Sequence, residues 1–291
     1  MENKEPIIYT KQSLVEELLK IKARGFVPNA RHGNHGGIGN TLEDLLGIEE
    51  NNLPLPNAAE WELKTQRIGT SSLTTLFHIE PSPRAIKFVP AVLLLKYGWR
   101  HQEAGAKYPK NEMSFRQTIH GVESNRGFRV VVDEAEQKVK ISFNHALVTD
   151  EHAEWKSFVE AGVGLGELAP QPYWGFDDLA AKAKTKLNNC FYVQAEVKRD
   201  KETKEESYHY KVIQKLTGFN FDGFLDGLRE GFVLVDFDAR TGHNHGTKFR
   251  LRQNFLPRLY KNVKTIESID DAEDENPTQP IEVNVEPTPA N

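Results

Sequence analysis

The sequence predicts an α/β or α+β fold with a central mixed sheet, because helical and strand-like segments alternate along its 291 residues. Residues 11–25 and 173–189 have apolar positions at helical spacing, whereas residues 60–66 alternate apolar and polar side chains as a strand does. Hydrophobic residues make up 38% of the chain, which is enough for a core. No apolar run approaches the ~18 residues of a membrane span, so no membrane is expected as a partner.

The predicted elements begin with two helices. Residues 11–25 form the first, and a glycine-rich link over residues 31–40 leads to the second. Asn40 or Thr41 would cap this second helix, and Gly47 would end it.

Strands and helices alternate after that point. Residues 60–66 and 72–80 are expected as neighbouring strands joined by a turn at Gly69, with Glu62 and Lys64 pointing outward. The remaining predicted elements are a helix over 85–98 kinked by its proline, a meander of strands over 114–121, 127–133 and 138–144, a helix over 173–189, a hairpin over 190–200 and 206–214, a helix over 221–231, and a strand over 232–240 that leads into a loop over 241–252.

The net charge of −5 is unevenly spread along the chain. Residues 265–291 contain no Lys or Arg and eight acids, namely Glu267, Asp270, Asp271, Glu273, Asp274, Glu275, Glu282 and Glu286. Taking those eight from the 42 acids of the chain leaves 34 against 37 Lys and Arg, a balance that permits a polyanionic partner. We therefore expect one folded domain over residues 1–264 and an acidic, disordered tail over residues 265–291.

Cysteine content and the N-terminus indicate the compartment. The single cysteine, Cys190, excludes an internal disulfide framework and a cysteine-rich zinc site. The first residues are polar and acidic, unlike a secretory signal. A reducing, cytoplasmic compartment is expected.

Glu62 and Lys64 are the first candidates for chemistry. Residues two apart on a strand project to the same face, with Cα atoms ~6–7 Å apart. A carboxylate there can hold Mg²⁺, and a neighbouring ammonium group can orient a water and stabilise charge on a phosphate. Exposed strands carry such pairs often, so this pair alone is weak evidence for hydrolysis of a phosphodiester.

Longer blocks of sequence make the indication specific. Residues 33–67, GNHGGIGNTLEDLLGIEENNLPLPNAAEWELKTQR, are followed in order by SLTTLFHIEPSPR, FRQTIHG, YWGFDDL and GHNHGTKFR. Over residues 11–264 the chain resembles the MvaI/BcnI family of type II restriction endonucleases, which belong to the nucleases with a Pro-Asp…Asp/Glu-x-Lys core. The resemblance implies a restriction-endonuclease-like mixed central sheet flanked by helices, with a DNA-recognition lobe inserted in the catalytic core.

The resemblance also assigns the catalytic residues. It makes Glu62 a metal ligand and Lys64 the catalytic lysine, and it places Glu43 at the border of the metal site. Asn57 stands where the family pattern has an Asp, so one negative charge is missing and Mg²⁺ would bind more weakly. Three accounts remain open: Asn57 is a weaker ligand, Glu60 supplies the charge, or the nuclease is slow or inactive.

The same resemblance assigns DNA-binding residues. The tripeptide His243-Asn244-His245 is not an HNH nuclease motif, whose residues are separated; in the family this segment reaches into the major groove. His243, His245 and Arg250 would then read base edges. His78 is a DNA-facing position at which BcnI-like members have His. A central C·G pair met by His78 and one histidine of the segment suggests a site of the CC(C/G)GG kind and the BcnI-like branch.

Phosphate contacts are expected from other basic residues, although each taken singly is an ordinary surface residue. They are Arg31, His32 and His35 in the glycine-rich link, Arg67 after the catalytic strand, and Arg116.

The function implied is Mg²⁺-dependent hydrolysis of double-stranded DNA at a short GC-rich site. The enzyme would act as a monomer in the bacterial cytoplasm, nick one strand and then the other, and leave 5′-phosphates. A cognate DNA methyltransferase would protect the host's own sites. Two alternatives are a MutH-like repair nickase that depends on partner proteins, and a non-catalytic DNA-binding relative in which Asn57 has abolished cleavage.

Overall fold

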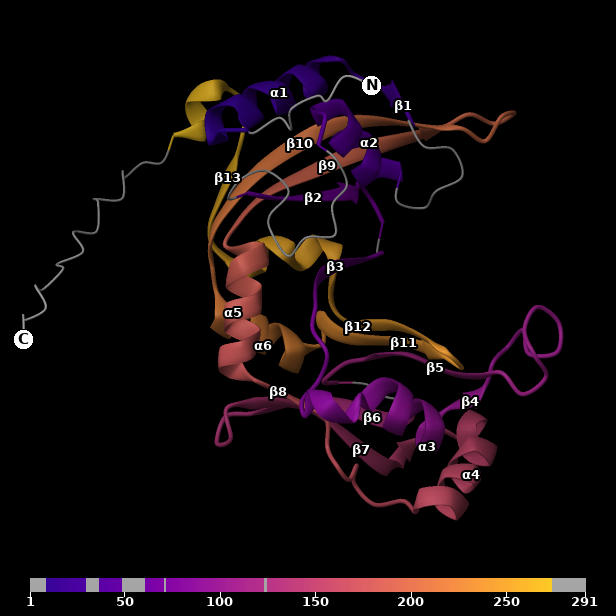
Figure 1. Cartoon of the computed structure of the whole chain (residues 1–291). Helices are drawn as coiled ribbons and strands as arrows, with labels where there is room; N and C mark the ends of the chain where they lie inside the picture. The colour runs from indigo at the N-terminus through magenta and orange to yellow at the C-terminus, as the bar shows by residue number, and fades with distance from the viewer. Residues whose placement is uncertain (1–8, 30–36, 49–60, 71, 123–124, 274–291) are drawn as a thin grey trace, which may run out of the picture.

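The computed structural model describes residues 9–29, 37–48, 61–70, 72–122 and 125–273, and their strands form three sheets. Figure 1 shows two lobes one above the other: an upper lobe with β2, β9 and β10, and a lower lobe with the remaining sheets. The mixed α+β architecture confirms the predicted fold class. None of the described helices is long and apolar enough to span a membrane.

The first sheet forms the upper lobe. Its order is β1-β10-β9-β2, with β13 paired to β10 as well. The strands are β1 (Val27–Pro28), β2 (Glu62–Arg67), β9 (Asn189–Arg199), β10 (Glu206–Phe219) and β13 (Tyr260–Thr265). It is a mixed sheet, because β2 runs parallel to β9 whereas the other pairs are antiparallel. Two helices lie against it, α1 (Lys11–Ala23) and α2 (Gly37–Leu46).

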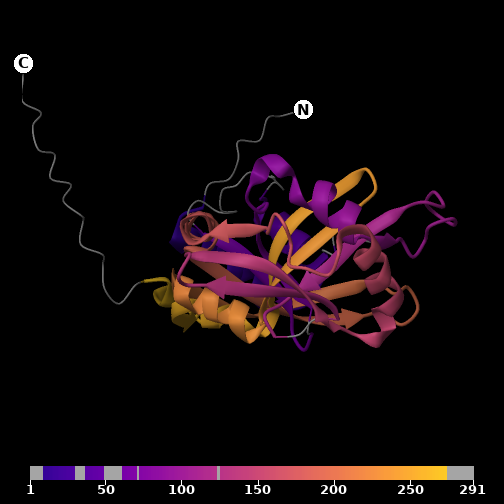
Figure 2. The ribbon, with the colours of Figure 1, turned by 90° about the horizontal axis from the view of Figure 1, so that it is seen from below.

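Two sheets form the lower lobe. The second sheet is antiparallel and has the order β3-β12-β11-β5-β4. Its strands are β3 (Leu73–His78), β4 (Trp99–Arg100), β5 (Met113–Ile119), β11 (Val233–Arg240) and β12 (His243–Arg252). The third sheet has the order β6-β7-β8 and consists of β6 (Arg126–Asp133), β7 (Lys138–Val148) and β8 (Tyr173–Gly175). Seen from below, the third sheet lies in front of the second (Figure 2).

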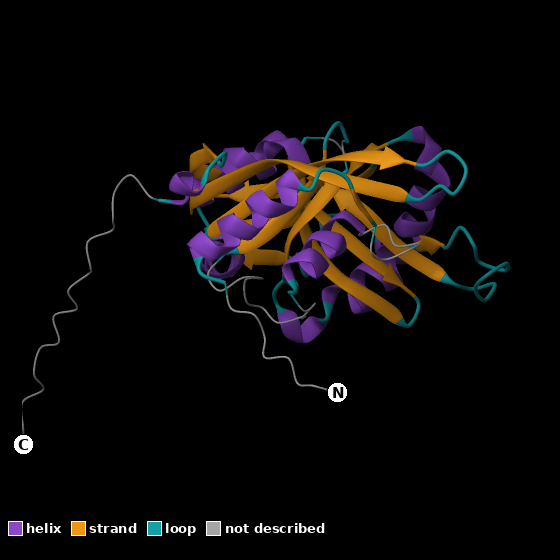
Figure 3. Ribbon diagram, turned by 90° about the horizontal axis from the view of Figure 1, so that it is seen from above, coloured by secondary structure: helices purple, strands orange, loops and turns teal. Residues whose placement is uncertain are grey.

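Helices cover the outer surfaces of these sheets, as the view from above shows (Figure 3). The α-helices of this part are α3 (Leu95–Tyr97), α4 (Ala153–Val163), α5 (Phe176–Leu187) and α6 (Phe221–Glu230). The kink expected from Pro90 is a π-helical segment, η2 (Val89–Leu94), which packs on β5, β11 and β12. Short 3₁₀ segments occupy Arg84–Ile86, Asp150–His152, Gln253–Leu259 and Ile269–Ala272.

Local sequence explains the helices nearest the first sheet. Thr10 and Ser13 form a reciprocal capping box at the start of α1, whose buried stripe is the one the spacing predicts. α2 begins at Gly37, so the predicted cap at Asn40 or Thr41 is wrong. A Cβ on Gly39 would stand 3.2 Å from Thr65 Oγ1, and this lack of a side chain lets α2 approach β2 closely.

Several predicted strand pairings are wrong. β5 does not join β6 and β7 in a meander; it pairs with β11 and β4. β3 is not the neighbour of β2 but the edge strand of the second sheet, paired with β12. The loop expected over 241–252 is strand β12, which follows a tight turn at Gly242, where φ is +73°. The β5–β11 and β3–β12 pairings join segments that are far apart in the chain.

The expected boundary at residue 264 is also wrong. Residues after it fold back on the first sheet, where Ile266 and Ala272 are fully or almost fully buried. Lys215 donates hydrogen bonds to the carbonyls of Ala272 and Glu273. The ordered chain therefore extends to residue 273, and the predicted disordered tail concerns residues 274–291, which lie outside the described residues.

Candidate active site

Strand β2 brings Glu62 and Lys64 together, as its two-residue period predicts. Lys64 Nζ donates to Glu62 Oε1 at 2.6 Å, and the side chains are only 15% and 6% exposed. The expectation that they point outward into solvent is wrong for Glu62, because both faces of β2 are covered at this point. Glu62 and Lys64 therefore form a largely buried ion pair.

The second oxygen of Glu62 has no hydrogen-bond donor within the described part of the chain. Glu62 Oε2 is buried and accepts no hydrogen bond from the described residues. Leaving a buried carboxylate oxygen unpaired is costly, and a hard divalent cation is the ligand that would satisfy it. The described residues contain no group of three or more His, Cys, Asp or Glu that could hold a metal ion. Glu62 thus fits one ligand of a divalent-metal site that needs further oxygens.

Of the other predicted catalytic residues, the structure describes only Glu43. Asn57, and Glu60 with it, lies outside the described residues. Glu43 is half-buried on α2, the helix that packs against β2. The structure therefore brings together two of the four predicted catalytic residues, Glu62 and Lys64.

Lys186 of α5 lies within electrostatic reach of this ion pair, and Lys182 lies one turn earlier on the helix. Cys190 of β9 is directly opposite Glu62 in the sheet, and α5 ends three residues earlier in the chain, at Leu187. The pKa of Lys186 is lowered by burial, while the nearby Glu62 charge opposes this shift and Lys64 and Lys182 add to it. Sequence analysis missed Lys182 and Lys186.

His78 faces the same region from the second sheet. It pairs with Lys248, which in turn pairs with Asp236 and then Thr118, so four polar residues form a row across the sheet. Partial burial lowers the pKa of His78, and Lys248, Lys182 and Lys64 lower it further against the opposing charge of Glu80. His78 is thus within electrostatic reach of Lys64 although their strands belong to different sheets.

The two histidines of the predicted recognition segment begin β12. His243 and His245 are both exposed, and their rings are nearly parallel, with centroids 6.4 Å apart. They lie two residues apart on one strand, so they present a shared face at the tip of the β11–β12 hairpin.

Arg250 is held within the sheet. It contacts Asp236 Oδ2 at 3.2 Å and donates to the Leu73 carbonyl at 3.0 Å. Thr118 Oγ1 donates to the other oxygen of Asp236 at 2.7 Å. The guanidinium of Arg250 is therefore oriented by the buried Asp236.

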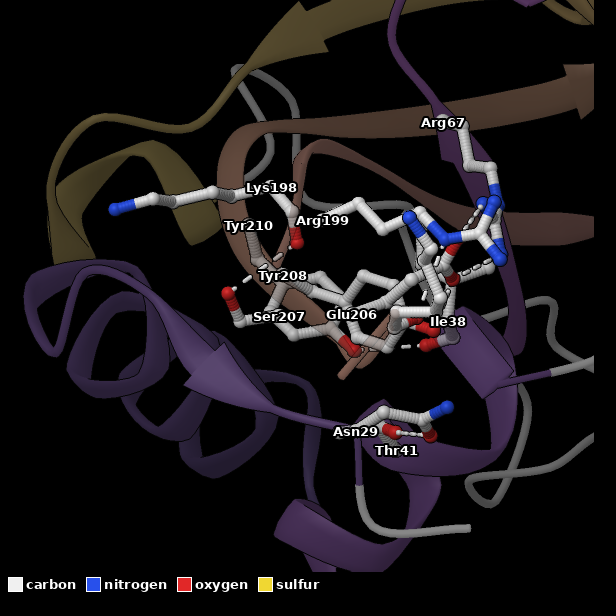
Figure 4. A network of polar contacts seen from close by, with 11 residues as sticks. Asn29, Ile38, Thr41, Arg67, Lys198, Arg199, Glu206, Ser207, Tyr208 and Tyr210 are labelled. Carbon is white, nitrogen blue, oxygen red and sulfur yellow. Dashed lines mark hydrogen bonds and ion pairs between the residues drawn. The ribbon is translucent and has the colours of Figure 1, made fainter. Parts of the chain in front are cut away.

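Arg67 is occupied as well. Its two terminal nitrogens donate to Glu206 at 2.9 and 2.7 Å, and Tyr208 donates to the same carboxylate at 2.9 Å (Figure 4). Arg67, with Tyr208 and Arg199 helping, lowers the pKa of Glu206. This network connects β2 to β10. Arg31, also predicted to contact phosphate, lies outside the described residues.

Comparison with protein families shows which family the chain belongs to. The model of the MvaI/BcnI restriction endonuclease family matches residues 15–260, most of the chain. The chain belongs to this family. Membership of the MvaI/BcnI family makes it a type II site-specific endonuclease, and it confirms the resemblance seen in the sequence. No curated protein sequence gives a significant match.

Solved structures support the fold. The complex of restriction endonuclease MvaI with cognate DNA has a TM-score of 0.69 and 24% identity, and the match covers 89% of this chain and 99% of MvaI. MvaI in the absence of DNA has a TM-score of 0.51 and 25% identity, over 90% and 99%. With nearly equal coverage, the fold of this MvaI/BcnI member is closer to the DNA-bound form of MvaI than to the free form.

Proposed function

We propose that this member of the MvaI/BcnI family is a Mg²⁺-dependent endonuclease that cuts double-stranded DNA at a short GC-rich site. The observation that carries the proposal is the buried pair of Glu62 and Lys64, in which Glu62 Oε2 has no hydrogen-bond donor among the described residues. A buried acceptor atom left open beside an ion pair is typical of a functional site that a ligand completes.

Each residue has a stated task in this proposal. Glu62 Oε2 and the oxygen of Asn57 would hold Mg²⁺, with Glu60 or Glu43 as further acids nearby in the family pattern. Bound Mg²⁺ would polarise the scissile phosphate and increase the acidity of a water. Lys64, fixed by Glu62, would orient the attacking water and stabilise charge on the phosphate oxygens. The water would lose a proton to solvent as its oxygen bonds to phosphorus in line with O3′. The P–O3′ bond would break and O3′ would take up a proton, leaving a 3′-hydroxyl and a 5′-phosphate.

Recognition would come from the second sheet. His78, His243 and His245 would read base edges, with a CC(C/G)GG-like site as the expected target. Arg250 would read guanine with the donors that Asp236 and the Leu73 carbonyl leave available. The phosphate contacts proposed for Arg31 and Arg67 stand as predictions, and Arg67 would have to leave Glu206 to make one.

The remaining features are proposals of the same kind. The enzyme would be a bacterial cytoplasmic monomer that nicks one strand and returns for the other. A cognate methyltransferase would modify the host's sites.

Incubation of the purified chain with plasmid and Mg²⁺, followed by sequencing of the fragment ends, tests the proposal. The expected result is cutting at one GC-rich site, with a nicked intermediate, and no cutting by Lys64→Ala. Normal cutting by Lys64→Ala would refute the assigned active site. Because Asn57 replaces an Asp, a non-catalytic DNA-binding protein is the second candidate. DNA binding in Ca²⁺ without cutting in Mg²⁺ or Mn²⁺, unchanged by Asn57→Asp, would support that candidate.

A further inference from the structure

Helix α5 joins the two lobes. It packs against β3 of the second sheet, and its C-terminal end leads directly into β9, where Cys190 is opposite Glu62. Figure 1 shows α5 running between the upper and the lower lobe. The last turn of this helix therefore leads into the end of β9 that pairs with Glu62, while the helix packs on β3, the strand that carries His78.

The lysines of α5 fall into two classes. Leu179, Ala183 and Leu187 form its fully buried stripe. Lys182 and Lys186 each precede a residue of that stripe, are one turn apart and are half-buried, as long side chains are when their stems pack on apolar surface. Lys184 is exposed, away from the stripe.

Lys64 and Lys182 act on the pKa of two side chains from different elements. Burial lowers the pKa of Lys186, Lys64 and Lys182 lower it further, and Glu62 opposes the shift. Burial also lowers the pKa of His78, and Lys248, Lys182 and Lys64 add to that shift.

The acids of this region are largely engaged. Glu62 is paired with Lys64, and Glu80 accepts from the backbone amide and the hydroxyl of Thr247. Asp238 lies 4.0 Å from Lys248 and 3.7 Å from Arg116. Among the described groups that these interactions link, the cations outnumber the acids, so this part of the described chain has an excess of positive charge. The cations are Lys64, Lys182, Lys186, Lys248 and Arg116, and the acids are Glu62, Glu80 and Asp238.

We propose that Lys182 and Lys186 bind neighbouring phosphates of the strand being cut and thereby position the scissile phosphate over Glu62 and Lys64. This inference depends on the proposed nuclease function and adds two positioning residues to it. Residues four apart on a helix differ by ~6 Å along its axis, and phosphates of one strand advance ~3.4 Å per nucleotide. Flexible lysine stems can accommodate that difference. Lys248 of β12 extends the same row of positive charges onto the second sheet.

The test compares Lys182→Gln and Lys186→Gln, singly and together, with Lys184→Gln as the matched control. Binding to a duplex that carries a CC(C/G)GG sequence, or the sequence cut by the wild type where that differs, is measured in Ca²⁺ between 50 and 200 mM salt. Each lost phosphate contact should reduce the slope of log K against log salt by about 0.9 and weaken binding about tenfold near 0.1 M salt. The double variant should lose about 1.8 of slope, and Lys184→Gln should behave as the wild type.

Cleavage and titration separate positioning from folding. Single-turnover cleavage at saturating protein should fall about tenfold or more in the double variant, because a misplaced phosphate is not aligned for attack. In the free protein, Lys182→Gln should raise the pKa of His78, measured by NMR, because one repelling charge is removed. Lys184→Gln should not change that pKa.

The outcomes are distinguishable. If the wild type binds and cuts while Lys182→Gln and Lys186→Gln keep the salt slope and rate of Lys184→Gln, the lysine proposal is wrong and the nuclease function stands. If the wild type binds in Ca²⁺ but does not cut, the nuclease function fails, and the salt slopes still test the two contacts. If the wild type does not bind DNA, both proposals are refuted.

Discussion

The Glu62–Lys64 ion pair predicts a mutational pattern in which two single substitutions are each worse for stability than the double substitution. The side chains are 6% and 15% exposed, so each charge depends on the other for its stabilisation. We consider Glu62→Leu, Lys64→Met and the two combined, because Leu and Met are apolar and approximate the lost volume.

The magnitudes follow from burial. Lys64→Met leaves a carboxylate buried without a cation, and Glu62→Leu leaves an ammonium buried without an acid. Each should lower the free energy of unfolding by about 3–5 kcal/mol. The double variant buries no charge, and replacing a buried ion pair with apolar residues is typically neutral or stabilising by about 1–4 kcal/mol. The coupling between the two positions should therefore exceed about 3 kcal/mol.

Urea unfolding of the four proteins measures this coupling, provided that the m values agree. Plasmid cleavage is measured in parallel, and all three variants should be inactive. The pair would then be a case in which function is retained at the expense of stability. Additive losses, with the double variant about 6–10 kcal/mol less stable than the wild type, would refute the reasoning.

Three of the remaining predictions concern charge at the site and beside it. Asn57→Asp adds a carboxylate, so the Mg²⁺ concentration for half-maximal cleavage should fall about tenfold; no change would show that position 57 does not ligate metal. Ca²⁺ at ten times its Kd should stabilise the wild type by about 1.4 kcal/mol and leave Glu62→Gln unaffected in thermal unfolding. Arg67→Gln should cost about 1–2 kcal/mol above pH 5, because the folded-state pKa of Glu206 is depressed and its contribution is present above its unfolded pKa. That cost should disappear as pH falls through the depressed pKa; a cost constant with pH would contradict it. A fourth prediction concerns His78, whose folded-state pKa is also depressed. Its contribution is present above pH ~6.5 and lost as pH falls below that value; His78→Asn should remove this loss from an unfolding series over pH 5–8.

Local features of the structure are the ones that sequence predicted well. The helix beginning at Lys11 and the hairpin of β9 and β10 follow from spacing and turn residues within a few positions. The shared face of Glu62 and Lys64 follows from the period of a strand. These properties depend on neighbours in the chain, which a sequence displays directly.

Pairing between distant segments was out of reach for sequence reasoning. β5 could be assigned as a strand, but its partner β11 lies more than a hundred residues later. The same limit affects individual side chains. Arg67 was predicted to contact phosphate, and its actual partner Glu206 is 139 positions away. Composition also misled at the C-terminus, where an acidic average concealed the buried Ile266 and Ala272.

The structure links recognition to catalysis through one helix. His78 lies on the sheet that would read bases, and Lys64 lies on the sheet that would cut, yet the charge of Lys64 acts on His78. Helix α5 packs against β3, the strand of His78, and leads into β9, the neighbour of β2, which carries Lys64. A strand of DNA bound along Lys182 and Lys186 would therefore touch a helix fixed to both sheets. Recognition of the bases and placement of the scissile phosphate would then depend on the same helix, because α5 packs on β3 and continues into β9 beside β2.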